Sequence, residues 1–371
     1  MKQGRTIFDL AEELERQRKN RKDFVADTRK LAVKTEQGQS LLQVVLPEGA
    51  EEFVVSELMH RQLGERLQIP QKYYQKMRGE DPELLDYNIN RWFTQQPASR
   101  MVRILDGKAR AFLSDRYRRL DKLELADVVF PFLKDMKGAE LASCEVTESH
   151  MFIKVINKRL QAEVDVGDAV QAGMVISNSE VGLGSLKVEP LLFRLVCKNG
   201  LIVKDYAQKR YHVGRQIENE DAAYEIFSDE TLAQDDKTFF MKVQDTLKTV
   251  VDDTLFQLSV DRLRQIKQLP TGNNPVQTVE VLADRYLLNQ NERGSILQHF
   301  IRDGDCSQYG LINAVTRASQ DIEDYGRATE LERLGGELLA SAASVVSVAM
   351  AASREEASRL MKNVTPLALV R

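Results

Sequence analysis

The residues that could carry out chemistry are few in this sequence, and their spacing matches no familiar catalytic signature. The four histidines form no HxxxH pair and the three cysteines form no CxxC pair, so we expect no zinc site. Residues 182–184 (GLG) lack the third glycine of a dinucleotide fingerprint, and the chain has neither a phosphate-binding Walker loop nor a GxSxG elbow. The sequence therefore predicts a protein that is not an enzyme and needs no metal or cofactor.

Cys197 and His212 are the one pair of residues that could be proposed as a catalytic nucleophile and its base. Cys197 follows Val196 on a predicted strand, and a cysteine in such a place is more often a packing residue than a nucleophile. We therefore expect Cys197→Ser to leave function intact.

The clearest local signal is a predicted hairpin over residues 101–113. Asp106-Gly107 lies between two segments of alternating polarity, and this dipeptide favours the type I′ turn, whose two central residues have positive φ. An uninterrupted register places Arg103 opposite Arg110 and Met101 opposite Phe112. The two arginines are then expected to point outward, on the face that Phe112 shares.

This outward face is a candidate nucleic-acid interface. Facing arginines repel each other, and a bound phosphate would remove that cost, while an aromatic ring could stack a base. On this hypothesis, replacing both arginines should not unfold the protein. The alternative is a solvated sheet face with no ligand. The predicted contact residues are Arg103, Lys108, Arg110, Phe112, Arg116, Tyr117, Arg118, Arg119, Lys198, Lys204, Lys209 and Arg210.

Charge is distributed unevenly along the 371 residues. Residues 1–120 carry 23 Lys+Arg against 18 Asp+Glu, whereas residues 216–371 carry 16 against 25. This asymmetry favours a polyanion partner at one end, although acidic helices that simply solvate the other end explain it equally well. Unpaired cysteines, the lack of an apolar signal segment and the short apolar run at 338–353 predict a cytoplasmic protein without a membrane span.

The periodicity predicts an α+β fold, with a mixed, largely antiparallel sheet core and flanking helices, followed by a helical C-terminal part. We divide the chain into residues 1–95 (helices and strands), 96–215 (sheet core) and 235–371 (helices). Three local features are also expected. They are a helix capping box formed by Asp121 and Glu124, a second hairpin turn at Asn199-Gly200, and one long amphipathic helix over residues 238–266.

Several of these segments resemble the phage- and plasmid-borne "domain of unknown function 932" family. Residues 114–120 (SDRYRRL) are similar to its SDRY opening, residues 175–179 (VISNS) to its LTNSHDG segment, and residues 191–201 (LLFRLVCKNGL) to its RVVCQNTL strand and turn. Residues 209–214 resemble a basic-aromatic-histidine element of the family, and residues 309–316 and 331–336 resemble the tail of some members. The resemblance implies a mobile genetic element and no established activity.

These observations lead to two hypotheses about function. The first is binding of single-stranded DNA, with possible strand annealing, by a homo-oligomer in phage or plasmid DNA maintenance. The second is a non-enzymatic interaction protein, such as a host-takeover or counter-defence factor, without affinity for nucleic acid. A basic groove that contacts phosphates would favour the first, and scattered charge would favour the second.

Overall fold

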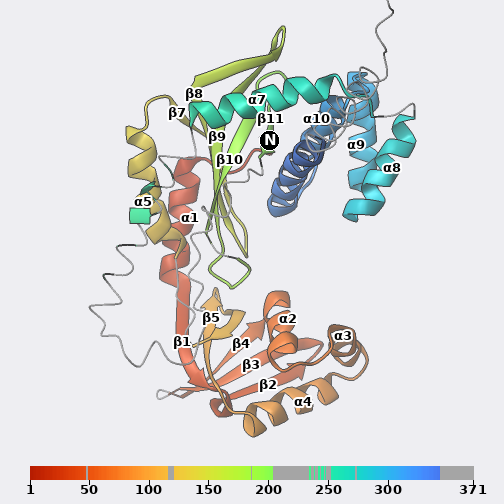
Figure 1. Ribbon diagram of the computed structural model, residues 1–371. Helices are drawn as coiled ribbons and strands as arrows, with labels where there is room; N and C mark the ends of the chain where they lie inside the picture. The colour runs from red at the N-terminus through yellow and green to blue at the C-terminus, as the bar shows by residue number, and fades with distance from the viewer. Residues whose placement is uncertain are drawn as a thin grey trace, which may run out of the picture.

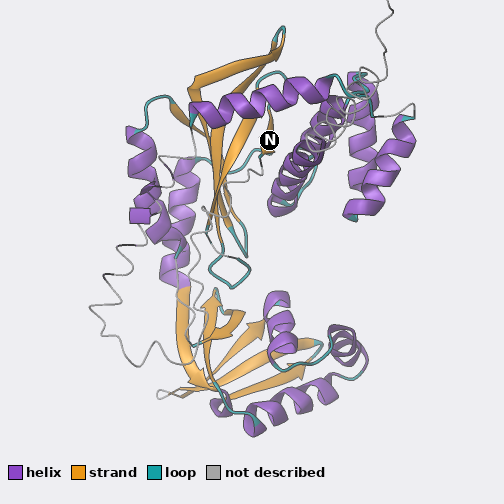
Figure 2. Cartoon of the chain, viewed as in Figure 1, coloured by secondary structure: helices purple, strands orange, loops and turns teal. Residues whose placement is uncertain are grey.

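The computed structural model describes residues 1–46, 49–115, 121–184, 186–203, 252–271 and 274–342, and isolated helical positions within 234–247. Within these residues the fold is α+β, as the periodicity predicts, but it contains two separate sheets (Figures 1 and 2). One sheet is mixed and the other is antiparallel.

The first sheet has six strands in the order β1-β5-β6-β4-β3-β2. All neighbouring pairs are antiparallel except β4 and β6, which run parallel. Its strands are β1 (Arg21–Asp27), β2 (Leu31–Glu36), β3 (Gln39–Leu46), β4 (Gly49–Val55), β5 (Ser99–Leu105) and β6 (Lys108–Ser114). The predicted hairpin is thus β5 and β6, and it pairs with strands from the first 55 residues. The sequence-based boundary between residues 95 and 96 therefore falls inside one sheet, because these long-range pairings leave no local signal.

Helices α2 (Glu57–Arg66), α3 (Gln71–Glu80) and α4 (Pro82–Gln95) pack on one face of this sheet. Their apolar side chains, among them Leu63, Tyr74 and Phe93, share a core with strand residues such as Val102. Ser56 caps α2 by accepting a hydrogen bond from Met59 N, and Asp81 does the same for Leu84 N at the start of α4.

The second sheet has five strands in the order β11-β10-β9-β8-β7. Its strands are β7 (Ala139–Val146), β8 (Met151–Asp165), β9 (Asp168–Asn178), β10 (Lys187–Arg194) and β11 (Asn199–Ile202). Strands β8 and β9 form a long hairpin that extends past the rest of the sheet (Figure 1). Asn199 pairs with Arg194, so Asn199-Gly200 lies within β11, and the turn is formed by residues 195–198. The expected turn at Asn199-Gly200 is therefore wrong.

Both faces of the second sheet are covered by helices. Helices α1 (Ile7–Asn20) and α5 (Lys122–Asp135) bury Leu10, Leu14 and Leu125 against one face. The opposite face packs against α7 (Asp253–Lys267), α10 (Gln308–Ala318) and the helical residues 325–342. Two outer helices, α8 (Pro275–Tyr286) and α9 (Gln290–Asp303), complete this C-terminal part through a core of their own with α10.

The C-terminal region is helical, as expected, but the long helix predicted over 238–266 is interrupted. Asp252 is extended, with φ −101° and ψ 132°, and its side chain accepts a hydrogen bond from Leu255 N. Helix α7 therefore begins at Asp253. An aspartate that caps a helix competes with helix continuation, and this explains why unbroken apolar periodicity did not give one helix.

Candidate functional site

The predicted hairpin forms, but its register contains a β-bulge. Asp106 and Gly107 have φ of 52° and 74°, as a type I′ turn requires. The register shifts between Arg103 and Ile104. As a result Phe112 pairs with Val102, and not with Met101 as predicted. One extra residue turns every later side chain to the other face.

Phe112 is consequently a core residue. Its side chain is 1% exposed and its ring stacks on Phe93, with centroids 5.7 Å apart and planes at 26°. Its backbone N donates to Gln62 Oε1 at 2.8 Å. The expectation that Phe112 stacks a base on an open sheet face is therefore wrong, because the bulge places its ring under the helices.

Arg103 is also buried, with 0% exposure. Its Nη2 donates to Asp23 Oδ2 and to Asp121 Oδ1, both at 2.9 Å, and its Nη1 donates to the backbone oxygen of Glu180 at 2.7 Å. The predicted outward orientation toward solvent is incorrect. The charge that was expected to need a phosphate is neutralised by two carboxylates.

Arg110 lies on the same side of the hairpin and reaches the second sheet. Its Nη2 donates to Glu180 Oε1 at 2.5 Å, and the residue is only 8% exposed. Its Nε and Nη1 are buried and have no hydrogen-bond partner among the described residues. A buried guanidinium with two unused donors is costly to maintain, so these two atoms mark a place where an acceptor would be stabilised.

The segment that covers the arginines follows β9. Glu180 and Val181 lie against the hairpin, and Gln62 Nε2 donates to the backbone oxygen of Val181 at 2.8 Å. Gly182 has φ of +81°, and a Cβ there would lie 2.6 Å from Leu113 Cδ2. Glycine is therefore required for both the turn and the close approach, and it lets this segment close over β5 and β6.

Helix α5 begins at the same place. Asp121 is its N-cap, as predicted, but the side chain makes no capping hydrogen bond, so the expected capping box with Glu124 is not formed. The carboxylate of Asp121 instead pairs with Arg103 and Arg21. The first helical residue, Lys122, is 2% exposed, and its Nζ lies 3.7 Å from Glu180 Oε1.

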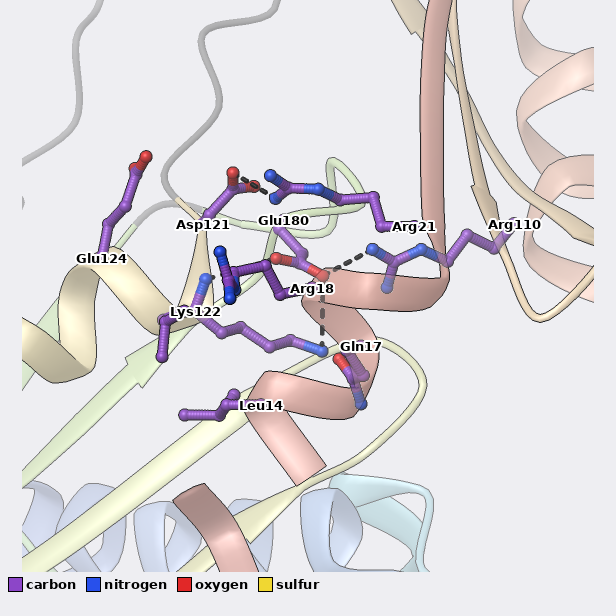
Figure 3. Close-up of a pocket in the computed structure, with 10 residues that line it drawn as sticks. Leu14, Gln17, Arg18, Arg21, Arg110, Asp121, Lys122, Glu124 and Glu180 are labelled. Carbon is purple, nitrogen blue, oxygen red and sulfur yellow. Dashed lines mark hydrogen bonds and ion pairs between the residues drawn. The ribbon is translucent and has the colours of Figure 1, made fainter. Parts of the chain in front are cut away.

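These groups line a pocket at the junction of the two sheets (Figure 3). Its volume is ≈ 90 Å³. Arg110 enters from β6 and Lys122 from α5, and both side chains point toward Glu180 (Figure 3). The lining residues are Leu14, Gln17, Arg18, Arg21, Arg110, Asp121, Lys122, Leu123, Glu124 and Glu180.

The ionisation of the pocket follows from burial and close charges. Burial lowers the pKa of Lys122 to about 8, although the carboxylate of Glu180 opposes part of this effect. Burial raises the pKa of Glu180, but Lys122, Arg110 and Arg103 outweigh it and bring that pKa down to about 2. Glu180 is thus ionised at neutral pH, and Lys122 is protonated but within reach of deprotonation.

The remaining predicted contact residues do not gather at this pocket. Lys108 and Lys198 are exposed, but Lys108 begins β6 in the first sheet and Lys198 lies in the turn before β11 in the second. Seven others fall outside the described residues: Arg116, Tyr117, Arg118, Arg119, Lys204, Lys209 and Arg210.

Sequence reasoning missed Asp23, Lys122 and Glu180 as members of the site. Glu180 lies 70 positions after Arg110, and nothing local connects the two. The one signal in the sequence was the pair of arginines predicted to face each other, because two such positive charges require anions nearby. Carboxylates of the same chain meet most of that need.

Cys197 has polar neighbours rather than the apolar ones expected. Its Sγ lies 3.5 Å from Arg194 Nη1 and 3.6 Å from Arg317 Nη1. His212, its hypothetical base, lies outside the described residues. The packing interpretation of Cys197 is therefore incomplete, since the thiol also accepts from two guanidinium groups.

The described part of the chain contains neither a metal-binding cluster nor a membrane-spanning helix. No group of three or more His, Cys, Asp or Glu side chains in it is placed to hold a metal ion. None of its helices has both the length and the apolar character that a membrane crossing requires.

The fold and pocket define an α+β protein whose two sheets meet at a buried ionic cluster. The model of the family described as "Domain of unknown function (DUF932)" matches residues 111–323. Because this match covers more than half of the chain, the protein belongs to that family, as the resemblance of its motifs implied. No curated protein and no solved structure matches it. The matched segment contains Asp121, Lys122 and Glu180 and begins directly after Arg110, so residues on both sides of its start build the pocket.

Proposed function

We propose that the protein binds single-stranded DNA by accepting a phosphate group in the pocket between its two sheets. The observation that carries this proposal is Arg110, a lining residue of that pocket whose Nε and Nη1 are buried and have no hydrogen-bond partner in the part of the chain that the structure describes. Phosphate oxygens suit these donors, because a guanidinium binds phosphate through two parallel hydrogen bonds.

The charge of the pocket supports an anionic ligand. Among the lining residues there are four cations and three carboxylates. The cations are Arg18, Arg21, Arg110 and Lys122, and the carboxylates are Asp121, Glu124 and Glu180. The excess is one positive charge while Lys122 is protonated, and a phosphate would reverse it.

The phosphate contact that we propose is enclosed by the protein and does not lie on an open face of the sheet. Arg103 and Phe112 stabilise the fold and are no longer proposed to contact DNA, whereas Arg110 is still proposed to contact it, with a different geometry. Lys122 is added as a second contact, and Glu180 as the carboxylate that orients both cations.

Strand annealing in phage or plasmid DNA maintenance is the wider role that we propose. Annealing brings two strands together, so a homo-oligomer that presents several pockets would serve it. Exposed apolar side chains on the outer helices, such as Val281 at 62% and Ile301 at 58%, offer surface for self-association. Light scattering that finds only monomers at all concentrations would contradict this part.

Fluorescence anisotropy with labelled single- and double-stranded oligonucleotides at two salt concentrations tests the proposal. We expect the single strand to bind more tightly, with affinity that decreases as salt increases, because phosphate neutralisation releases counterions. Absence of binding to any oligonucleotide at low salt would contradict the proposal. The non-enzymatic interaction protein would then be the better account.

A further inference from the structure

The start of helix α5 is a second feature of the pocket. Lys122, Leu123 and Glu124, the first three residues of this 14-residue helix, all line the pocket. The side chain of the N-cap, Asp121, is held by Arg103 and Arg21 and does not cap the helix. The backbone N of Lys122 donates instead to Glu180 Oε2 at 3.3 Å, so the positive end of the helix dipole faces the carboxylate that also holds Arg110 and Lys122 Nζ.

The size of the pocket restricts what can enter. A volume of ≈ 90 Å³ is well below the roughly 300–1,000 Å³ of sites that enclose whole small molecules. The polar heads that would contact a ligand are nearly covered, since Lys122 is 2% and Arg110 8% exposed. A space of this volume suits a group about as large as one tetrahedral anion and is too small for a nucleoside.

From these features we infer that the pocket recognises a terminal phosphate monoester of a DNA strand, not an internal phosphodiester. An internal phosphate carries a nucleoside on each side, so both would have to pass through one small opening. A terminal phosphate enters from one side only. Its second negative charge also suits the combination of Arg110, Lys122 and the α5 N-terminus better than the single charge of a diester.

This inference rests on the proposed function, and its test separates the two. Four single-stranded DNAs of one sequence are compared by competition against a labelled strand: linear with a 5′-phosphate, linear with a 3′-phosphate, linear with hydroxyls at both ends, and circular. We expect one phosphorylated strand to compete about tenfold better than the hydroxyl strand and the circle, since a charge-assisted hydrogen bond is worth at least this much. The strand that gains identifies the end that is bound.

A matched pair of variants locates the effect. Lys122→Met should remove the preference for the phosphorylated end, so that this strand competes no better than the hydroxyl strand or the circle. Lys76→Met, which alters an exposed lysine of α3, should keep the preference. Inorganic phosphate should displace the phosphorylated strand from wild-type protein more readily than chloride does at equal ionic strength, and this arm depends on no variant.

Equal affinity of wild-type protein for all four strands would overturn the inference while leaving single-strand binding intact. Loss of the preference in both variants would also overturn it, because the phosphate would then lie elsewhere. If no strand binds at all, the proposed function itself fails, and the inference fails with it.

Discussion

Arg110 Nη2 and Glu180 Oε1 lie 2.5 Å apart and join the two sheets of the protein. Arg110 belongs to β6 of the first sheet, and Glu180 follows β9 of the second. Because Glu180 also faces Lys122, one carboxylate holds two cations from different elements in the lining of one pocket. The position of the pocket is thus a consequence of how the sheets are joined.

Arg103 should be essential for stability. Arg103→Ala removes the fully buried partner of Asp23 and Asp121 and leaves them with the partly exposed Arg21, and breaking a buried ion pair in this way costs about 3–5 kcal/mol. Urea denaturation monitored by circular dichroism should show a much lower midpoint. Lys108→Ala, on the same hairpin but exposed, serves as the control and should leave the midpoint unchanged. An unchanged midpoint for Arg103→Ala would mean that the cluster is not formed.

Phe112 should matter for stability and not for binding. Phe112→Ala removes a ring that is 1% exposed and stacked on Phe93, and such truncations cost about 3–5 kcal/mol. The same variant, measured under conditions where it remains folded, should bind single-stranded DNA as well as wild-type protein does. Weaker DNA binding together with unchanged stability would restore the stacking hypothesis.

The hairpin shows which structural features the sequence could predict and which it could not. Asp106-Gly107 predicted the turn correctly, because positive φ at two adjacent positions is a local property of these residue types. The bulge beside Arg103 was not predictable, since a register shift of one residue depends on which side chains the rest of the protein buries. That single residue changed Phe112 from a candidate contact into a core residue.

The pocket was partly predictable for a related reason. Two arginines close together on one strand pair indicated an anion nearby, and the structure places Glu180 there. The identity of that anion depends on a contact between segments 70 positions apart, which a single sequence does not encode locally. The break before α7 was predictable in part. Asp252 could have been recognised as a helix cap, but the apolar periodicity around it indicated one continuous helix.

The ion pair between Lys154 and Glu332 should anchor the C-terminal helices to the second sheet. Both side chains are 0% exposed, and Lys154 Nζ lies 2.7 Å from Glu332 Oε2. Glu332→Gln should cost about 3–5 kcal/mol, because it leaves a buried ammonium group without its counterion. The double variant Lys154→Met with Glu332→Leu should recover most of this loss in denaturant titrations. Equal losses for the single and double variants would show that the charges themselves are unimportant.

Binding should depend on pH through Lys122. Burial lowers the pKa of Lys122 to about 8 from the ordinary 10.5, with Arg110 and Arg103 adding to the decrease and Glu180 opposing it. Lys122 is therefore charged below pH 8 and loses its proton as pH rises above it. Affinity for single-stranded DNA should be highest below pH 8 and decrease about tenfold by pH 10, since a charged contact is lost.

Stability should change in the opposite direction over the same range. Between pH 8 and 10.5 the unfolded chain keeps a proton on Lys122 that the folded protein has released, so the free energy of unfolding should rise with pH. Lys122→Met should weaken both dependences. A wild-type protein whose DNA affinity and stability have the same pH profiles as this variant would contradict the assignment.

The salt dependence of single-strand binding by wild-type protein, Lys122→Met and Lys76→Met tests the phosphate pocket most directly. Each neutralised phosphate contributes about 0.7 to the slope of log affinity against log salt for single strands. We predict that Lys122→Met lowers the slope by about 0.7 relative to wild type, and that Lys76→Met, at an exposed position of α3, leaves it nearly unchanged. Identical slopes for wild type and Lys122→Met, with both proteins folded, would contradict a phosphate bound at this pocket.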